Sequence, residues 1–145
     1  MLMGGVFAVD FVTITNRAAV SRSVDETWRR IGNFFDLGLF LDVECNPFCG
    51  RGELGSLRLI NGVILEPLVG KGQHSYTYAQ TVGPMSGCAY HGCVECNAVG
   101  SGAEIVYTIL YDQSKLGSDL RRPEFERLSS RFSTAVEAMR KLAEA

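Results

Sequence analysis

Two oppositely charged residues, Arg58 and Glu66, lie eight positions apart on either side of an Asn61-Gly62 turn. If both side chains lie on one face of the hairpin they should pair, because an isolated buried charge is prohibitively costly. In an apolar cleft, Glu66 could act as a general acid or base while Arg58 polarises a carbonyl and Tyr90 donates a hydrogen bond. The alternatives are an inward ion pair that only orders the sheet, or two surface charges.

The length of the hairpin loop decides whether the two charges share a face, because side chains alternate along a strand. A two-residue turn pairs Arg58 with Leu65 and sends Glu66 to the other face. A three-residue loop over 60–62 pairs Arg58 with Ile64 and makes Glu66 its diagonal neighbour on the same face. The Asn-Gly sequence fits both loops.

Two motifs match cofactor patterns but lack the structural context that those patterns need. Gly50-x-Gly52-x-x-Gly55 matches the dinucleotide fingerprint, which requires a helix after its third glycine, whereas residues 56–60 have the composition of a strand. Cys93 and Cys96 have zinc-like spacing, but residues three apart in a strand face opposite sides. We therefore expect no cofactor and no metal, and we interpret the thiols as buried side chains, including those of Cys45 and Cys49.

The two histidines, His74 and His91, have neither a nucleophile nor a metal-ligand spacing around them. We interpret both as surface or internally satisfied side chains. His91 should point away from Tyr90, toward solvent, and His74, at the start of a strand, could line the rim of a cavity.

The composition indicates one globular domain over residues 1–145. The chain has 145 residues, 46% of them hydrophobic and 21% charged, and a formal net charge of −2. This hydrophobic fraction excludes a disordered protein. A nucleic-acid binder would show a basic excess, so we expect no nucleic-acid partner.

The sequence also predicts the cellular compartment. No stretch of about 20 apolar residues occurs that could span a membrane. The segment Met1–Asp10 lacks the basic start of a signal peptide. Five cysteines, an odd number, are then most simply reduced thiols, and we expect a cytoplasmic protein.

The chain pattern predicts a strand, two short helices, six strands and a long helix. Residues 7–20 form the first strand, and Ser23 to Glu26 read as a capping box. The helix that follows ends near 32–33, and 34–41 form a second short helix. Regular turn signals place six strands at 43–46, 54–61, 63–69, 73–82, 87–98 and 103–112. Apolar residues at helical spacing predict an amphipathic helix over 123–145.

Several short segments resemble one family along nearly the whole chain. Val24 to Phe34 resembles its first helix, Gly50 to Arg58 its glycine-rich loop and next strand, and Leu65–Leu68 and Ser75–Tyr78 two further strands. The chain is similar in these respects to the SRPBCC, or START and Bet v 1-like, helix-grip superfamily. Its polyketide cyclase/dehydrase-like branch, with lachrymatory factor synthase and the abscisic-acid receptors, is the most similar.

The resemblance implies an α+β helix-grip fold, in which a seven-stranded antiparallel curved sheet wraps around a long C-terminal helix. In the lachrymatory factor synthase pattern an Arg, a Glu and a Tyr face the cavity and do chemistry. The positions that match are Arg58, Glu66 and Tyr90, which favours the three-residue loop. The short Asn61-Gly62 connection departs from the longer gating loop of the plant proteins, so we expect no lid there.

The resemblance also sets which side chains would contact a ligand. It turns the alternating tyrosines inward, beside apolar residues of the last strand and the long helix. The ligand-binding residues expected on this basis are Tyr76, Tyr78, Tyr107, Tyr111, Ile105, Ile109, Phe132 and Met139. Phenol hydroxyls in a cavity need partners and could anchor a ligand, or they could belong to an aromatic core.

Three functions follow from this interpretation. The first is binding of a small hydrophobic, aromatic or polyketide-like molecule between sheet and helix. The second is a cofactor-free cyclase, dehydratase or isomerase that uses Glu66 as general acid or base with Arg58 and Tyr90. The third is a lipid or precursor carrier, whose outer face would meet a partner or a second copy in a homodimer. The apolar residues expected on that outer face are Leu57, Leu59, Val106 and Leu110.

Overall fold

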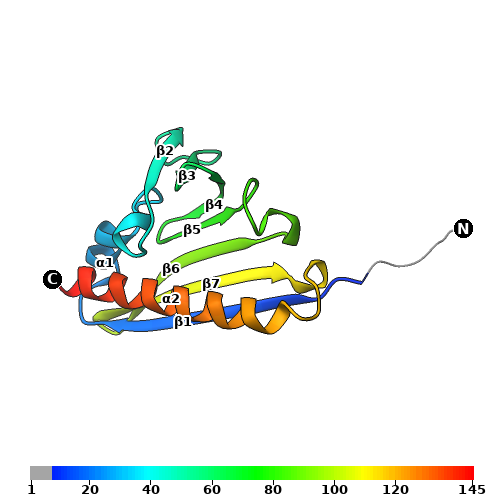
Figure 1. Ribbon diagram of the computed structural model, residues 1–145. Helices are drawn as coiled ribbons and strands as arrows, with labels where there is room; N and C mark the ends of the chain where they lie inside the picture. Colours follow the sequence, from blue (N-terminus) through cyan, green and yellow to red (C-terminus); the bar gives the residue numbers. More distant parts are fainter. Residues whose placement is uncertain (1–7) are drawn as a thin grey trace, which may run out of the picture.

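Seven antiparallel strands form one sheet in the order β1-β7-β6-β5-β4-β3-β2 (Figure 1). The computed structural model describes residues 8–145, so most of the Met1–Asp10 segment and the first residue of the predicted strand 7–20 lie outside it. Every neighbouring pair except β1 and β7 follows directly in sequence, which is the topology that the regular turn signals predict. The strands are β1 (Phe11–Val20), β2 (Cys45–Cys49), β3 (Leu57–Ile60), β4 (Ile64–Gly72), β5 (Ser75–Ala79), β6 (His91–Val99) and β7 (Gly102–Asp112).

The long helix α2 (Arg121–Glu144) lies across the curved sheet and packs against β1 and β7 (Figure 1). Its apolar stripe is fully or almost fully buried, at Leu128, Phe132, Ala135, Val136 and Met139. Inward side chains of the central strands meet that stripe, because alternate residues of a strand share one face. The predicted α+β helix-grip architecture is confirmed.

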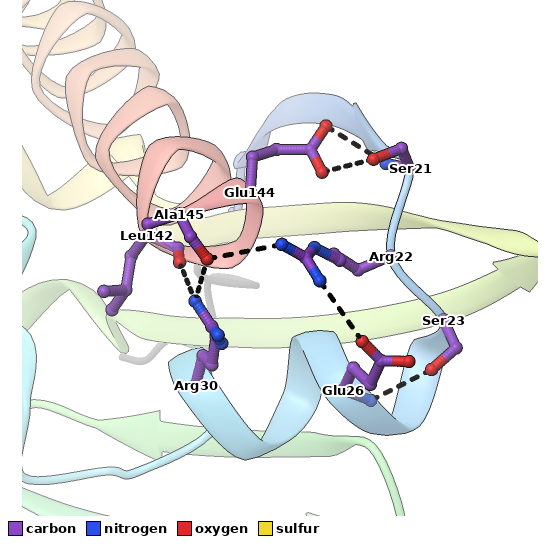
Figure 2. Close-up of polar contacts among 8 residues, drawn as sticks. All are labelled: Ser21, Arg22, Ser23, Glu26, Arg30, Leu142, Glu144 and Ala145. Carbon is purple, nitrogen blue, oxygen red and sulfur yellow. Dashed lines mark hydrogen bonds and ion pairs between the residues drawn. The ribbon is translucent and has the colours of Figure 1, made fainter.

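Helix α1 (Val24–Ile31) begins at the predicted cap. The Ser23 hydroxyl accepts a hydrogen bond from the Glu26 amide at 3.2 Å. The Glu26 carboxylate does not complete a capping box but lies 3.8 Å from Arg22 (Figure 2). One half of the predicted box is therefore present, and an ion pair takes the place of the other half.

Polar contacts fix the C-terminal end of α2 against the β1–α1 connection (Figure 2). Arg30 of α1 donates to the carbonyl oxygens of Leu142 and Ala145, and Glu144 accepts from the amide and hydroxyl of Ser21. The last carbonyls of a helix lack intrahelical partners and carry partial negative charge, so a guanidinium there stabilises the helix end. These contacts hold the C-terminal end of α2 in place relative to α1 and to the end of β1.

Several predicted element boundaries differ from those of the structure. The predicted helix 34–41 is a single 3-10 turn, η1 (Leu37–Leu39), and the strand expected from residue 87 begins only at His91 after a second such turn, η2 (Ser86–Cys88). A third, η3 (Gln113–Lys115), follows β7. The predicted turn at Asn46-Pro47 lies inside β2 instead. Proline is tolerated there because β2 is an edge strand whose register shifts beside Pro47.

The apolar side chains expected on the outer face of the sheet differ in their exposure. Of the four apolar residues expected there, Val106 is buried at 3% exposure, whereas Leu57, Leu59 and Leu110 are half-buried. Among residues 8–145, no helix is both long and apolar enough to cross a membrane.

Candidate functional site

The β3–β4 hairpin brings Arg58 and Glu66 directly opposite each other. The register pairs Arg58 with Glu66 and Ile60 with Ile64, so the loop consists of residues 61–63. Asn61 and Gly62 both adopt positive φ, at 52° and 72°, the left-handed conformation that asparagine and glycine tolerate best. The predicted shared face is confirmed. The predicted diagonal register is wrong, because the loop begins one residue later than expected.

The Arg58 guanidinium is completely buried, and each of its three nitrogens donates a hydrogen bond. Its Nε and Nη2 donate to Glu66 Oε1 at 3.0 and 2.9 Å, and Nη1 donates to the Phe34 carbonyl oxygen at 2.8 Å. The rings of Phe34 and Tyr78 both pack against it, with centroids 4.5 and 4.2 Å from Cζ. Burial alone would lower the pKa of Arg58, but Glu66 and the nearby tyrosines hold that pKa well above its ordinary value. Arg58 therefore remains a cation inside the protein.

The second carboxylate oxygen of Glu66 faces a different set of groups. Glu66 Oε2 accepts a hydrogen bond from Gln80 Nε2 at 3.1 Å, and Gln80 Oε1 in turn accepts one from the Met85 amide at 2.8 Å. This chain of bonds ties β4 to the segment that follows β5. A carboxylate oxygen has more than one acceptor direction, so Glu66 Oε2 can still accept a hydrogen bond from a ligand.

A cavity of about 150 Å³ lies between the first half of α2, the β3–β4 hairpin and the segment after β5; we name it the helix cavity. Its apolar lining consists of Leu37, Leu41, Ile60, Ile64, Pro84, Met85, Leu128 and Phe132. Its polar lining consists of Glu66, Tyr78, Gln80, Tyr90, Arg127 and Arg131. Apolar walls with a few convergent polar groups are typical of sites for small ligands.

The two arginines of the helix cavity differ in their partners. Arg127 donates to both carboxylate oxygens of Glu124, at 2.6 and 2.9 Å. Arg131 forms no ion pair within residues 8–145. Arg131 is thus a cation at the cavity that a ligand could contact.

The tyrosines inside the sheet are neutral phenols. Tyr78 and Tyr107 share a hydrogen bond between their hydroxyl oxygens at 2.7 Å, and burial raises the pKa of both well above its usual range. Burial also raises the pKa of Tyr90, so its hydroxyl at the helix cavity is a hydrogen-bond donor at neutral pH. Gly92 makes room for this arrangement, because a Cβ there would lie 2.2 Å from the Tyr78 ring.

The predicted site residues fall into three groups. Those that line the helix cavity are Glu66, Tyr78, Tyr90 and Phe132. Arg58 contacts Glu66 but does not line the helix cavity, and Tyr76 lines a separate pocket. The remaining predicted ligand contacts are buried in the core and line neither cavity: Ile105, Tyr107, Ile109, Tyr111 and Met139.

The sequence interpretation missed most of the lining of the helix cavity, including Gln80, Arg127 and Arg131, and it also missed Phe34 beside Arg58. Gln80 could have been found, because it continues the alternate positions of Tyr76 and Tyr78. Phe34 contributes its backbone carbonyl and its ring from outside any strand or helix, and no local pattern signals that.

The interpretation of the cysteines as buried thiols is right for Cys96 but wrong for Cys49, which is exposed, and Cys45 is half-buried. Cys93 is half-buried opposite Thr108, and Cys96 is buried opposite Ile105, so the two thiols face opposite sides of β6. The Gly50–Gly55 loop leads into strand β3. Within residues 8–145, no group of three or more side chains is arranged to hold a metal ion.

The histidines make local contacts. His91 Nδ1 is 2.8 Å from the Ala89 carbonyl oxygen, and His91 itself is half-buried. His74 Nε2 lies 2.7 Å from Asp25 Oδ1, which links the β4–β5 turn to α1. Neither histidine lines the helix cavity.

Comparison with known proteins identifies the fold. No family model and no curated protein sequence matches the chain. Solved structures do match. A protein from Nitrosospira multiformis has a TM-score of 0.74 at 19% identity, and the match covers 90% of this chain and 94% of that one. An uncharacterized protein from Bacillus thuringiensis has a TM-score of 0.71 at 15% identity, and the match covers 90% of this chain and 97% of that one. Ara h 8.0201, a Bet v 1-like allergen, matches with a TM-score of 0.69 at 10% identity over 92% of this chain and 98% of its own. The chain therefore shares its fold with these three structures.

Proposed function

We propose that the protein binds a small, mainly apolar molecule in the helix cavity, with a polar end of that molecule directed to Glu66 and Tyr90. The observation that carries the proposal is the combination in one cavity of an apolar wall with an acceptor, Glu66 Oε2, and a donor, the Tyr90 hydroxyl. The fold shared with Ara h 8.0201 supports it, since such folds enclose a cavity between sheet and helix.

The volume of the helix cavity limits the ligand. A cavity of about 150 Å³ in another protein is known to hold benzene, and drug-sized ligands occupy about 300–1,000 Å³. At about 150 Å³ the helix cavity suits a single substituted ring. Of the ligands considered from sequence, a simple aromatic molecule fits better than a fused polyketide or a lipid.

The test combines ligand identification with a residue-specific readout. Native mass spectrometry of freshly purified protein would detect a retained molecule. Protein labelled with 13C-methyl methionine would then be titrated with phenol, a one-ring molecule with a hydroxyl donor. Met85 lines the helix cavity, so its methyl signal should shift saturably.

A blocked cavity provides the decisive comparison. Ile64→Trp places a large ring at the half-buried cavity wall and should weaken phenol binding at least about tenfold. Val63→Trp, one residue away and 67% exposed outside the lining, is the matched control and should bind like the parent. An unmoved Met85 signal, or equal binding by the two variants, would refute the proposal.

A second function is favoured by one observation: Glu66 and Tyr90 line the same cavity. In this cofactor-free acid-base enzyme, Glu66 takes a proton from the carbon next to a carbonyl. The C–H electron pair forms a carbon–carbon double bond, and the π pair of the carbonyl moves onto its oxygen. The Tyr90 hydroxyl donates a hydrogen bond to that oxygen, and Arg58 positions Glu66. Return of the proton to a different carbon of the enolate completes an isomerisation, and its return to the same carbon leaves only hydrogen exchange.

The acid-base function is tested by hydrogen exchange at carbon. Acetophenone has one ring and an enolisable methyl group, so its incorporation of deuterium from D2O reports the proton transfer directly. Glu66→Gln should abolish the exchange while acetophenone affinity stays within about tenfold, and Tyr90→Phe should slow it by about 10²-fold. Exchange no faster than in buffer, or equal loss of exchange and binding in Glu66→Gln, would leave Glu66 as a binding group only.

A further inference from the structure

A second pocket, of about 200 Å³, lies beside the glycine-rich loop and shares no lining residue with the helix cavity. Phe34 lines this pocket and Tyr78 lines the helix cavity, and the Arg58 guanidinium contacts both rings. We name it the glycine-loop pocket. Its lining residues are Trp28, Gly32, Asn33, Phe34, Phe35, Arg51, Gly52, Leu68, Lys71, Ser75 and Tyr76.

Four aromatic side chains form one continuous wall of the glycine-loop pocket. The ring centroids of Trp28 and Tyr76 are 5.9 Å apart, those of Tyr76 and Phe34 5.7 Å, and those of Phe34 and Phe35 5.4 Å. Gly32 sets the position of the indole, because a Cβ there would lie 2.5 Å from the Trp28 ring. Such a wall offers ring faces and edges to a flat aromatic ligand.

The opposite side of the glycine-loop pocket is cationic. Arg51 and Lys71 both line it, and neither forms an ion pair within the described part of the chain. Lys71 Nζ donates to the Gly52 carbonyl oxygen at 2.8 Å, which holds the ammonium group beside the loop. None of the lining residues is acidic.

The Glu53 carboxylate belongs to the same loop, and backbone hydrogen bonds and, to a smaller extent, the charge of Lys71 lower its pKa. Glu53 accepts a hydrogen bond from the Arg51 amide at 2.9 Å, and Asp25 lies 2.7 Å from His74 Nε2. The glycine-loop pocket therefore combines an aromatic wall with two cationic side chains, which Glu53 balances only in part, and no acidic residue lines it.

We propose that the glycine-loop pocket is a second binding site, separate from the helix cavity, for a one-ring aromatic carboxylate. The ring packs against Trp28 and Tyr76, and the carboxylate contacts Arg51 and Lys71. A volume of about 200 Å³ holds one substituted ring, since about 150 Å³ is enough for benzene. The site does not depend on what the helix cavity binds.

Trp28 makes the site directly observable, because it is the single tryptophan of the chain and its indole N–H gives one signal in a 1H–15N spectrum. Titration with benzoate should shift that signal saturably. Benzamide, a neutral molecule of the same size, should bind at least about tenfold more weakly. An indole signal that benzoate does not move, or equal affinities for the two molecules, would overturn the proposal.

Charge variants complete the test. The double variant Arg51→Gln/Lys71→Gln should reduce benzoate affinity to that of benzamide, whereas Lys115→Gln, at a lysine outside the pocket lining, should not change it. Arg131→Gln removes a cation from the helix cavity and should leave the Trp28 titration unchanged. If Arg131→Gln and not the double variant abolished the shift, benzoate would be bound in the helix cavity and the second site would be refuted.

Discussion

Replacing Glu66 by glutamine removes the carboxylate charge that faces Arg58 while keeping the size of the side chain. Arg58 is 0% exposed and Glu66 3%, so the remaining guanidinium charge has no access to water. Breaking a buried ion pair from one side costs about 3–5 kcal/mol of folding free energy. We expect about 3 kcal/mol for Glu66→Gln, the low end of that range. The glutamine oxygen, the Phe34 carbonyl and the two covering rings still contact Arg58.

The assay is equilibrium unfolding in urea, followed by Trp28 fluorescence and far-ultraviolet circular dichroism. For a chain of this length, 3 kcal/mol corresponds to a decrease in Tm of about 6–12 °C. Glu104→Gln is the matched control, because its carboxylate pairs with Arg17 at 3.0 Å but both side chains are partly exposed. An exposed pair contributes about 0–1 kcal/mol, so this variant should resemble the parent.

A double variant distinguishes an unpaired charge from simple loss of packing. Arg58→Met/Glu66→Gln leaves no buried charge, and methionine fills an elongated space with a flexible apolar chain. This protein should be more stable than Glu66→Gln alone by about 1–2 kcal/mol, although it carries one more substitution. The reasoning is refuted if the free energy of unfolding of Glu66→Gln lies within about 1 kcal/mol of the parent value, which is the contribution of an exposed pair. It is also refuted if the double variant is no more stable than Glu66→Gln.

Three further predictions concern other parts of the fold. Gly92→Ala should lower stability by about 1–3 kcal/mol, measured by thermal unfolding, because its Cβ would lie 2.2 Å from the Tyr78 ring. Iodoacetamide near neutral pH should modify the exposed Cys49 well before Cys96, whose pKa burial raises to about 11, as followed by mass spectrometry. Hydrogen bonds from Ser114 and the Asp10 amide lower the pKa of Asp112 below its ordinary 3.8, so its contribution to stability exists above that pH and is lost on acidification. The stability difference between parent and Asp112→Asn, from urea unfolding at several pH values, should therefore be largest at neutral pH.

Each of these predictions has a control or a contrary result. Gly87→Ala adds a Cβ with nothing within 4 Å and should be neutral, so equal effects of the two glycine changes would remove the steric explanation. Equal labelling rates for Cys49 and Cys96 would contradict the burial of Cys96. A stability difference for Asp112→Asn that grows as the pH falls would have the wrong sign for a lowered pKa.

Local sequence patterns were enough for most of the fold. The period of the apolar residues in 123–145 predicts α2, and the spacing of turn residues predicts a meander of antiparallel strands. Failures occurred where propensity and context disagree. Residues 34–41 are apolar enough for a helix, but they form only a 3-10 turn because Phe34, Leu37 and Leu41 are each buried in the core from an irregular backbone.

Part of the candidate site could also be predicted from the sequence, and part could not. That Arg58 and Glu66 share a face follows from strand alternation once the parity of the loop is chosen, and the burial of Tyr78 and Tyr107 follows in the same way. The alternation of side chains along a strand could not give the register of the hairpin. Asn61 and Gly62 both accept positive φ, so the loop can begin at residue 60 or at residue 61, and this choice changes the partner of Arg58.

By itself, the sequence determined most of the elements and which side chains of a strand share a face, because both depend on spacing along one segment. Only the tertiary structure decided that Phe34 and Tyr78 pack against the guanidinium, that Gln80 joins Glu66 to Met85, and that two pockets with separate linings form. Those contacts join residues from different elements. They depend on how far the sheet curves and where α2 crosses it, and these are set by packing of the whole core rather than by any local pattern.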